Sequence, residues 1–147
     1  MGLMDDLGRG PIGLDTAPFI YFIEEHPEYL RLVDPVFASV DRRHRCAITS
    51  GVTLLEVLVG PYRAGNLQLA ERYEALLTRS RGLKMIDLSR PLLRSAAQIR
   101  SRYQVRTPDA LQLAAAMAKG CTVFLTNDRD LPAIPGMRIL QLRDYTQ

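Results

Sequence analysis

Short runs of β-branched and apolar residues alternate along the chain with longer stretches in which apolar residues recur every three to four positions. This alternation is typical of an α/β domain in which helices cover a mainly parallel sheet. We predict strands at residues 12–15, 47–49, 84–88, 122–125 and 138–140. The apolar pattern therefore predicts the fold class, an α/β domain with a mainly parallel sheet.

Polar residues with short side chains mark the starts of the predicted helices. We expect helices after Thr16, from Val52 to about Val59 behind a Ser50 cap, after Asn66, after Ser89 and from Thr107. Gly60 and Pro61 are expected to end the second of these helices, and Thr107 is expected to cap the last one, with Pro108 in its first turn.

The patterned part of the chain, residues 12–142, predicts a single domain with its own core. Residues 1–11 are expected to form a flexible leader, and residues 143–147 a tail. No apolar run approaches the length that crosses a bilayer, and the acidic N-terminus is unlike a secretory signal. The two cysteines belong to no metal-binding pattern and are expected to be reduced. These features predict a cytoplasmic protein that is not attached to a membrane.

Four carboxylates from distant segments are predicted to meet at one edge of the sheet. Asp15 and Asp128 lie just after predicted strands, whereas Glu56 and Asp109 lie near the starts of predicted helices. Ligands of open parallel sheets bind outside the carboxyl ends of the strands. We therefore expect Asp15, Glu56, Asp109 and Asp128 to converge there.

Taken singly, three of these acids have an ordinary structural explanation. Asp15 is a suitable helix start, Asp109 suits the positive end of a helix dipole, and Asp128 is a common turn former. Glu56 is different, because it interrupts an apolar helix stripe formed by residues 52, 55 and 59. The alternative for Glu56 is a position at the edge of the stripe, where it reaches water or pairs with an arginine.

A cluster of carboxylates is the chemistry that a hard divalent cation requires. Mg²⁺ and Mn²⁺ prefer oxygen ligands, and without a cation the crowded negative charges repel one another. Such an ion lowers the pKa of a bound water and stabilises the charge of a phosphate under attack. The cluster thus predicts phosphate-ester hydrolysis with Mg²⁺ or Mn²⁺.

Four segments of the chain match the motifs of one family in order, spacing and context. They are LDT at 14–16 with the apolar helix that follows it, TSGVTLLEVLVG at 49–60, RTPDALQLAAA at 106–116 and FLTNDRDL at 124–131. Over roughly residues 12–142 the chain resembles the PIN domain family, in particular the VapC-like toxin ribonucleases of type II toxin–antitoxin systems. Ala17 and Pro18 depart from the family pattern, in which a small polar residue is frequent there.

The resemblance implies a three-layer α/β/α fold and Mg²⁺- or Mn²⁺-dependent hydrolysis of RNA. It assigns metal binding and catalysis to Asp15, Glu56, Asp109 and Asp128. It also implies that Thr16 and Thr126 form hydrogen bonds at the rim and that Asp130 is an acid just outside the ligand set.

The same resemblance implies a homodimer and a cognate antitoxin that blocks the site. The alternatives are a housekeeping PIN-type RNA-processing nuclease without an antitoxin, a small-molecule phosphoesterase and a catalytically silent binding module. Net charge is +3, and 17 of the 19 basic residues are arginines. This bias suits contact with phosphate, but a GC-rich genome also produces it. Two arginine groups, at 42–45 and 79–81, either contact the RNA backbone or are solvated loop residues.

Overall fold

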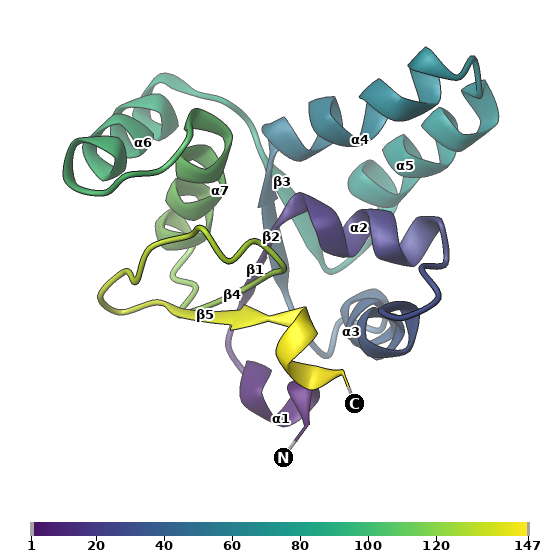
Figure 1. The fold of residues 1–147 in the computed structure, drawn as a ribbon, viewed down its shortest axis with the longest axis horizontal. Helices are drawn as coiled ribbons and strands as arrows, with labels where there is room; N and C mark the ends of the chain where they lie inside the picture. The colour runs from purple at the N-terminus through teal and green to yellow at the C-terminus, as the bar shows by residue number, and fades with distance from the viewer. Residues whose placement is uncertain (1, 147) are drawn as a thin grey trace.

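The computed structural model describes residues 2–146 and contains a five-stranded sheet in which every neighbouring pair is parallel (Figure 1). Met1 and Gln147, the outermost residues of the expected leader and tail, lie outside this range. The strands are β1 (Ile12–Leu14), β2 (Ala47–Ser50), β3 (Leu83–Ile86), β4 (Val123–Thr126) and β5 (Arg138–Gln141), in the order β3-β2-β1-β4-β5. The predicted α/β class with a mainly parallel sheet is confirmed, and the strand bounds differ from the predicted ones by one or two residues.

Helices connect the strands and cover the sheet. They are α1 (Leu3–Leu7), α2 (Thr16–Ile23), α3 (Leu30–Asp41), α4 (Gly51–Arg63), α5 (Leu67–Arg79), α6 (Arg90–Arg102) and α7 (Thr107–Ala118), followed by a 3₁₀ turn, η1 (Leu142–Tyr145). No helix in the described part of the chain is both long and apolar enough to cross a membrane.

The core is divided in two by the sheet, because successive side chains of a strand point to opposite faces. Ile12 and Leu14 face a core shared with α1 to α5, whereas Phe124 faces a smaller core shared with α6 and α7. Figure 1 shows α6 and α7 on one side of the sheet and α2 to α5 on the other. The expected three-layer α/β/α arrangement is therefore confirmed.

Gly13, in the central strand, lets α7 approach the sheet closely. A Cβ atom at this position would lie 2.7 Å from Phe124 Cδ1 and 2.8 Å from Ala116 Cβ, which is closer than real Cβ contacts. The missing side chain thus brings the helix that carries Asp109 close to β1.

Four of the helices begin with a side-chain cap from a short polar residue. Asp15 Oδ1 accepts a hydrogen bond from the Thr16 amide at 2.8 Å. Ser50, Asn66 and Ser89 accept amide hydrogen bonds at 3.3, 3.1 and 3.3 Å at the starts of α4, α5 and α6. The start of α7 differs, because Arg106 is the residue before the helix and Thr107 is its first residue, with no side-chain cap.

Two helices lie where the sequence pattern predicts none. Within the expected flexible leader, residues 3–7 form α1, and its Leu3 and Leu7 are buried in the larger core. Leucines four positions apart share one helix face, which explains why this short helix packs against the domain. The second, α3, contains Pro35, but Val33 and Val36 on its apolar face are fully buried.

The structure also places the end of α4 differently from the prediction. Gly60 and Pro61 were expected to end this helix, yet it continues to Arg63. Pro61 cannot donate a hydrogen bond to the preceding turn, but it lies in the last turn of the helix and is buried. Burial of the ring offsets the missing hydrogen bond, so the helix ends only after Pro61.

Candidate active site

A cleft of about 660 Å³ lies at the carboxyl ends of β1 and β4. It is lined by Asp15, Thr16, Ala17, Ile20, Tyr21, Glu56, Arg106, Asp109, Asn127, Asp128 and Asp130. The structure thus brings the four predicted carboxylates together, and Asp130 joins them. Thr126, buried at the end of β4, contacts the cluster through a hydrogen bond to Asp15.

Asp15 is held by two hydrogen bonds at the start of α2. Its Oδ1 accepts from the Thr16 amide at 2.8 Å, and its Oδ2 accepts from Thr126 Oγ1 at 2.6 Å. Burial raises the pKa of Asp15, the two hydrogen bonds lower it, and the charges of Asp109 and Glu56 raise it further. Burial is the largest of these contributions, so the pKa is raised and the charged form of Asp15 is disfavoured.

Glu56 reaches the cleft from α4, where its Oε1 accepts a hydrogen bond from Thr16 Oγ1 at 2.5 Å. Only Val52 of the helix stripe that singled out Glu56 in the sequence is buried, because Leu55 is 64% exposed and Val59 is 42% exposed. The other buried residues of α4 are Thr53, Val57 and Pro61, which do not belong to that stripe. The reason given for selecting Glu56 was therefore wrong, although this residue does line the cleft.

Arg106 lies between two of the carboxylates. Its Nε is 3.2 Å from Asp109 Oδ2, and its Nη2 is 3.8 Å from Asp128 Oδ2. Burial raises the pKa of Asp109, Arg106 lowers it, and the charges of Asp128 and Glu56 raise it again. The Arg106 side chain is 76% exposed, so its guanidinium offsets the carboxylates only partly.

The segment after β4 is shaped by its own hydrogen bonds. The Asp128 amide donates to Thr126 Oγ1 at 3.0 Å, and the Asp130 amide donates to Asp128 Oδ1 at 2.9 Å. Asn127 Oδ1 accepts from the backbone amide and from Nε of Arg143 at 3.0 and 3.1 Å. These contacts connect the turn to η1 and fix the backbone at Asp128.

The residues present fit a hard divalent cation that retains several waters. Five carboxylates and one guanidinium line the cleft, which leaves excess negative charge and only oxygen ligands. Within residues 2–146, no three Asp, Glu, His or Cys side chains are placed to hold a single ion. Mg²⁺ needs no such cage, because one or two carboxylates and water commonly hold it.

A buried polar network beneath the cleft centres on Gln112, which is 2% exposed. Its Oε1 accepts from the amide and the hydroxyl of Ser50 at 3.1 and 3.0 Å. Its Nε2 donates to Thr53 Oγ1 at 2.6 Å and to Thr16 Oγ1 at 3.2 Å. The network therefore connects α7 to both segments that carry Asp15 and Glu56.

Sequence reasoning missed Gln112, Arg106 and Asn127 as parts of this region. A signal for Gln112 was present, since it is the one polar residue in the buried run from Ala110 to Ala116. Arg106 and Asn127 each lie within three residues of a predicted acid. Whether their side chains point into the cleft, however, depends on the tertiary structure.

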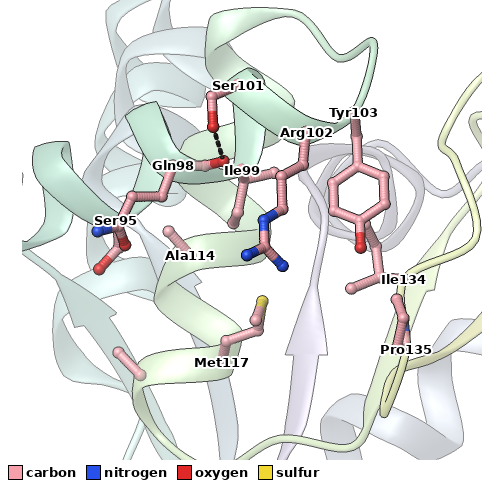
Figure 2. Close-up of a pocket in the computed structure, with 11 residues that line it drawn as sticks. Ser95, Gln98, Ile99, Ser101, Arg102, Tyr103, Ala114, Met117, Ile134 and Pro135 are labelled. Carbon is pink, nitrogen blue, oxygen red and sulfur yellow. Dashed lines mark hydrogen bonds between the residues drawn. The ribbon is translucent and has the colours of Figure 1, made fainter.

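A larger cavity, of about 770 Å³, lies between α6 and α7 and shares no lining residue with the carboxylate cleft. Figure 2 shows Arg102, Tyr103 and Met117 directed into it, with Ile134 and Pro135 at one side. No carboxylate belongs to its lining, so this cavity lacks the groups that the hydrolytic chemistry requires.

The carboxylate cleft lies within a segment that matches a family model. The model is described as the PIN domain and matches residues 12–137. No curated protein sequence matches the chain significantly.

The fold is similar to solved structures of VapC toxins from VapBC toxin–antitoxin complexes. A chain of the Rickettsia felis VapBC2 complex, bound to a DNA fragment from its promoter, has a TM-score of 0.69 and 18% identity, covering 89% of this chain and 98% of that one. VapC20 of Mycobacterium tuberculosis, described as a sarcin-ricin loop cleaving toxin, has a TM-score of 0.66 and 18% identity, covering 81% and 91%. A chain of DNA-bound VapBC from Salmonella typhimurium has a TM-score of 0.60 and 26% identity, covering 90% and 98%.

Proposed function

Because the chain belongs to the PIN domain family, we propose that it is a metal-dependent endoribonuclease and the toxin of a toxin–antitoxin pair. The observation that supports this function most is the convergence of Asp15, Glu56, Asp109 and Asp128 in one open cleft. An open cleft of this kind admits a polymer such as RNA.

One or two of the four carboxylates would hold each Mg²⁺ or Mn²⁺ ion, together with waters and phosphate oxygens of RNA. Such an ion, when bound, would supply an acidified water and would neutralise charge at the phosphate. Thr126 and Thr16 fix the orientations of Asp15 and Glu56 through their hydroxyl protons. Arg106 is exposed at the mouth of the cleft, where its guanidinium is able to turn from Asp128 to a phosphate oxygen.

The purified protein tests this proposal when it is incubated with RNA, DNA and a phosphomonoester in Mg²⁺, Mn²⁺ or a chelator. We expect RNA cleavage that requires the metal and is lost in Asp15→Asn, Glu56→Gln, Asp109→Asn and Asp128→Asn. Asp87→Asn is the matched control, because Asp87 also follows a strand end but does not line the cleft.

Each alternative function has its own outcome in this experiment. Cleavage of the phosphomonoester without cleavage of RNA would indicate a phosphoesterase. A folded protein that binds RNA and cleaves none of the substrates would indicate a binding module. RNA cleavage that survives both chelation and Asp109→Asn would exclude the metal mechanism.

We propose that the antitoxin contacts the exposed apolar surface of α4 and of the adjoining start of α5. On this surface Leu55, Val59, Tyr62 and Leu67 are 64, 42, 57 and 64% exposed. Exposed apolar residues grouped on one side of a domain are typical of protein interfaces, and Glu56 of the cleft lies on the same helix. The complexes of the similar VapC proteins support a partner of this kind.

Expression in cells separates a toxin from an RNA-processing nuclease. We expect expression of this chain alone to arrest growth, Asp15→Ala to relieve the arrest, and co-expression of the adjacent small gene to relieve it also. Leu55→Glu with Tyr62→Glu is expected to abolish rescue by the antitoxin and to leave RNA cleavage intact. An active enzyme that is harmless alone would favour the processing role.

We also propose that the chain forms a homodimer. Light scattering tests this, and twice the mass of one chain is expected.

A further inference from the structure

We propose that Gln112 is a positioning residue, whose buried carboxamide directs the Thr16 hydroxyl proton toward Glu56. The inference rests on the proposed function, because it concerns how Glu56 is held for metal binding. Gln112 itself does not line the cleft and is 2% exposed. Any effect on the carboxylates must therefore pass through the residues that it contacts.

The backbone of Ser50 determines which end of the Gln112 carboxamide faces α4. A backbone N–H can only donate, and the Ser50 amide nitrogen is 3.1 Å from Oε1. The Ser50 hydroxyl donates to the same oxygen at 3.0 Å. The Nε2 group, with its two protons, is consequently the end that faces the threonines.

Both protons of Nε2 are used. One is donated to Thr53 Oγ1 at 2.6 Å and the other to Thr16 Oγ1 at 3.2 Å. Thr16 therefore accepts from Gln112, and its single proton remains for another acceptor. The distance to Glu56 Oε1 is 2.5 Å, against 3.5 Å to Thr53 Oγ1, so the proton points at Glu56.

The hydroxyls of Thr49 and Thr53 form other hydrogen bonds and do not compete for the Thr16 proton. Thr53 lies 2.6 Å from Thr49 Oγ1, and Thr49 donates to the Leu14 carbonyl at 2.9 Å. Every polar side-chain atom of Gln112, Thr16, Thr49 and Thr53 has a partner. A buried network with all groups paired is rigid, and loss of its central member leaves several groups to find new partners.

Without Gln112, the Thr16 hydroxyl is free to turn toward Thr53 and to release Glu56. Residues that hydrogen-bond to metal ligands change metal affinity by about 10- to 100-fold when they are replaced. We therefore expect Gln112→Met to weaken Mn²⁺ binding by about tenfold. Thr16→Val should have the same effect, while Thr16→Ser, which keeps the hydroxyl, should retain affinity within about twofold.

The experiment is a Mn²⁺ titration of the full chain, followed by calorimetry or by electron paramagnetic resonance. The titration includes the double variant that combines Gln112→Met with Thr16→Val. If Gln112 acts through Thr16, this double variant binds Mn²⁺ no more weakly than the single variant with the lower affinity. Additive losses, or an unchanged affinity in Gln112→Met, would overturn the proposal.

Ile99→Ala is the control for general destabilisation, because Ile99 belongs to the same α6 and α7 core but has no part in the network. Ile99→Ala should lower stability and leave Mn²⁺ affinity unchanged. If Ile99→Ala loses as much Mn²⁺ affinity as Gln112→Met, the role of Gln112 is structural only. If Gln112→Met does not fold, Gln112→Leu replaces it. A Leu side chain neither accepts from Ser50 nor donates to Thr16, so the same loss is expected.

A readout without metal separates this proposal from the proposed function. In a crystal structure of metal-free Gln112→Met, we expect the Glu56 carboxylate to lie beyond hydrogen-bond distance of Thr16 Oγ1, and an unchanged contact would overturn the proposal. A wild-type protein that neither binds Mn²⁺ nor cleaves RNA would refute the proposed function, and the crystal structure would still decide the role of Gln112.

Discussion

Thr126 donates its hydroxyl proton to Asp15 Oδ2 over 2.6 Å, although 111 positions separate the two residues in the chain. The contact follows from the sheet, because Leu14 and Leu125, which precede them, are register partners in β1 and β4. The same hydroxyl accepts from the Asp128 amide at 3.0 Å. One side chain thus connects two segments of the carboxylate cluster.

Thr126→Val is expected to shift the acidic limb of the pH–rate profile upward by about one unit. The Thr126 hydrogen bond lowers the pKa of Asp15, so its loss raises that pKa. A hydrogen bond to a charged group contributes about 1.5–3 kcal/mol, and one pKa unit corresponds to about 1.4 kcal/mol. The measurement is RNA cleavage against pH, with Thr126→Ser as control. An unmoved acidic limb would contradict this assignment.

Asp109→Asn is expected to stabilise the metal-free protein while abolishing cleavage. The pKa of Asp109 is raised, chiefly by burial, so the folded state disfavours its charge. The Asp109 carboxyl contributes fully to the free energy of unfolding below the ordinary aspartate pKa. This contribution is lost as the pH rises through the elevated pKa of the folded state. The variant should therefore gain roughly 0.5–2 kcal/mol at pH 7.

Urea unfolding in chelator measures this gain. It should vanish at a pH where the wild-type carboxyl is protonated, whereas the exposed Asp87→Asn should change stability by less than about 0.5 kcal/mol at either pH. A less stable Asp109→Asn at neutral pH would disprove the prediction.

Arg106→Gln should bind Mn²⁺ more tightly and RNA more weakly. Arg106 contributes positive charge beside Asp109 and Asp128. Two unit charges about 4 Å apart interact by about 1 kcal/mol in water, so we expect removal of this charge to tighten Mn²⁺ binding by roughly fivefold at most. Loss of one phosphate contact should also lower the salt slope of RNA binding by about 1.

Metal titration and RNA binding at several salt concentrations measure these two effects. Arg129→Gln is the matched control, because Arg129 pairs with Asp144 and does not line the cleft. Weaker Mn²⁺ binding by Arg106→Gln would show that the guanidinium supports the ion instead of opposing it.

Gly13→Ala is expected to destabilise the fold by about 1–3 kcal/mol, because the new Cβ would overlap Phe124 and Ala116. Gly60→Ala is the control, since an added Cβ there meets no atom within 4 Å and Gly60 lies inside α4. That variant should gain roughly 0.5–1 kcal/mol from helix propensity. Chemical denaturation measures both, and equal stabilities would refute the close packing of β1 and α7.

The positions of Asp15 and Asp128 could be predicted because they depend on local signals. Strands end where β-branched runs stop, and in a parallel sheet all such ends meet at one edge. Ser50, Asn66 and Ser89 were likewise identifiable as caps from residue type alone. These features require no knowledge of how distant segments pack.

The features that could not be predicted depend on tertiary contacts. An apolar stripe shows amphipathicity but not which stripe is buried, so Leu55 and Val59 were assigned to the wrong face of α4. The α1 helix is too short to be stable alone and forms because Leu3 and Leu7 are buried. The direction of the Gln112 side chain depends on groups in β2, α2 and α4, which no local pattern reveals.

The strand order has a consequence for the protein during synthesis. The central strand β1 is made first, but its neighbour β4, which precedes Asp128, is among the last elements to be made. A nascent chain that has only reached α7 lacks both Asp128 and the hydroxyl of Thr126. The complete carboxylate cluster therefore cannot form until the segment that carries Thr126 and Asp128 has been made and has paired with β1.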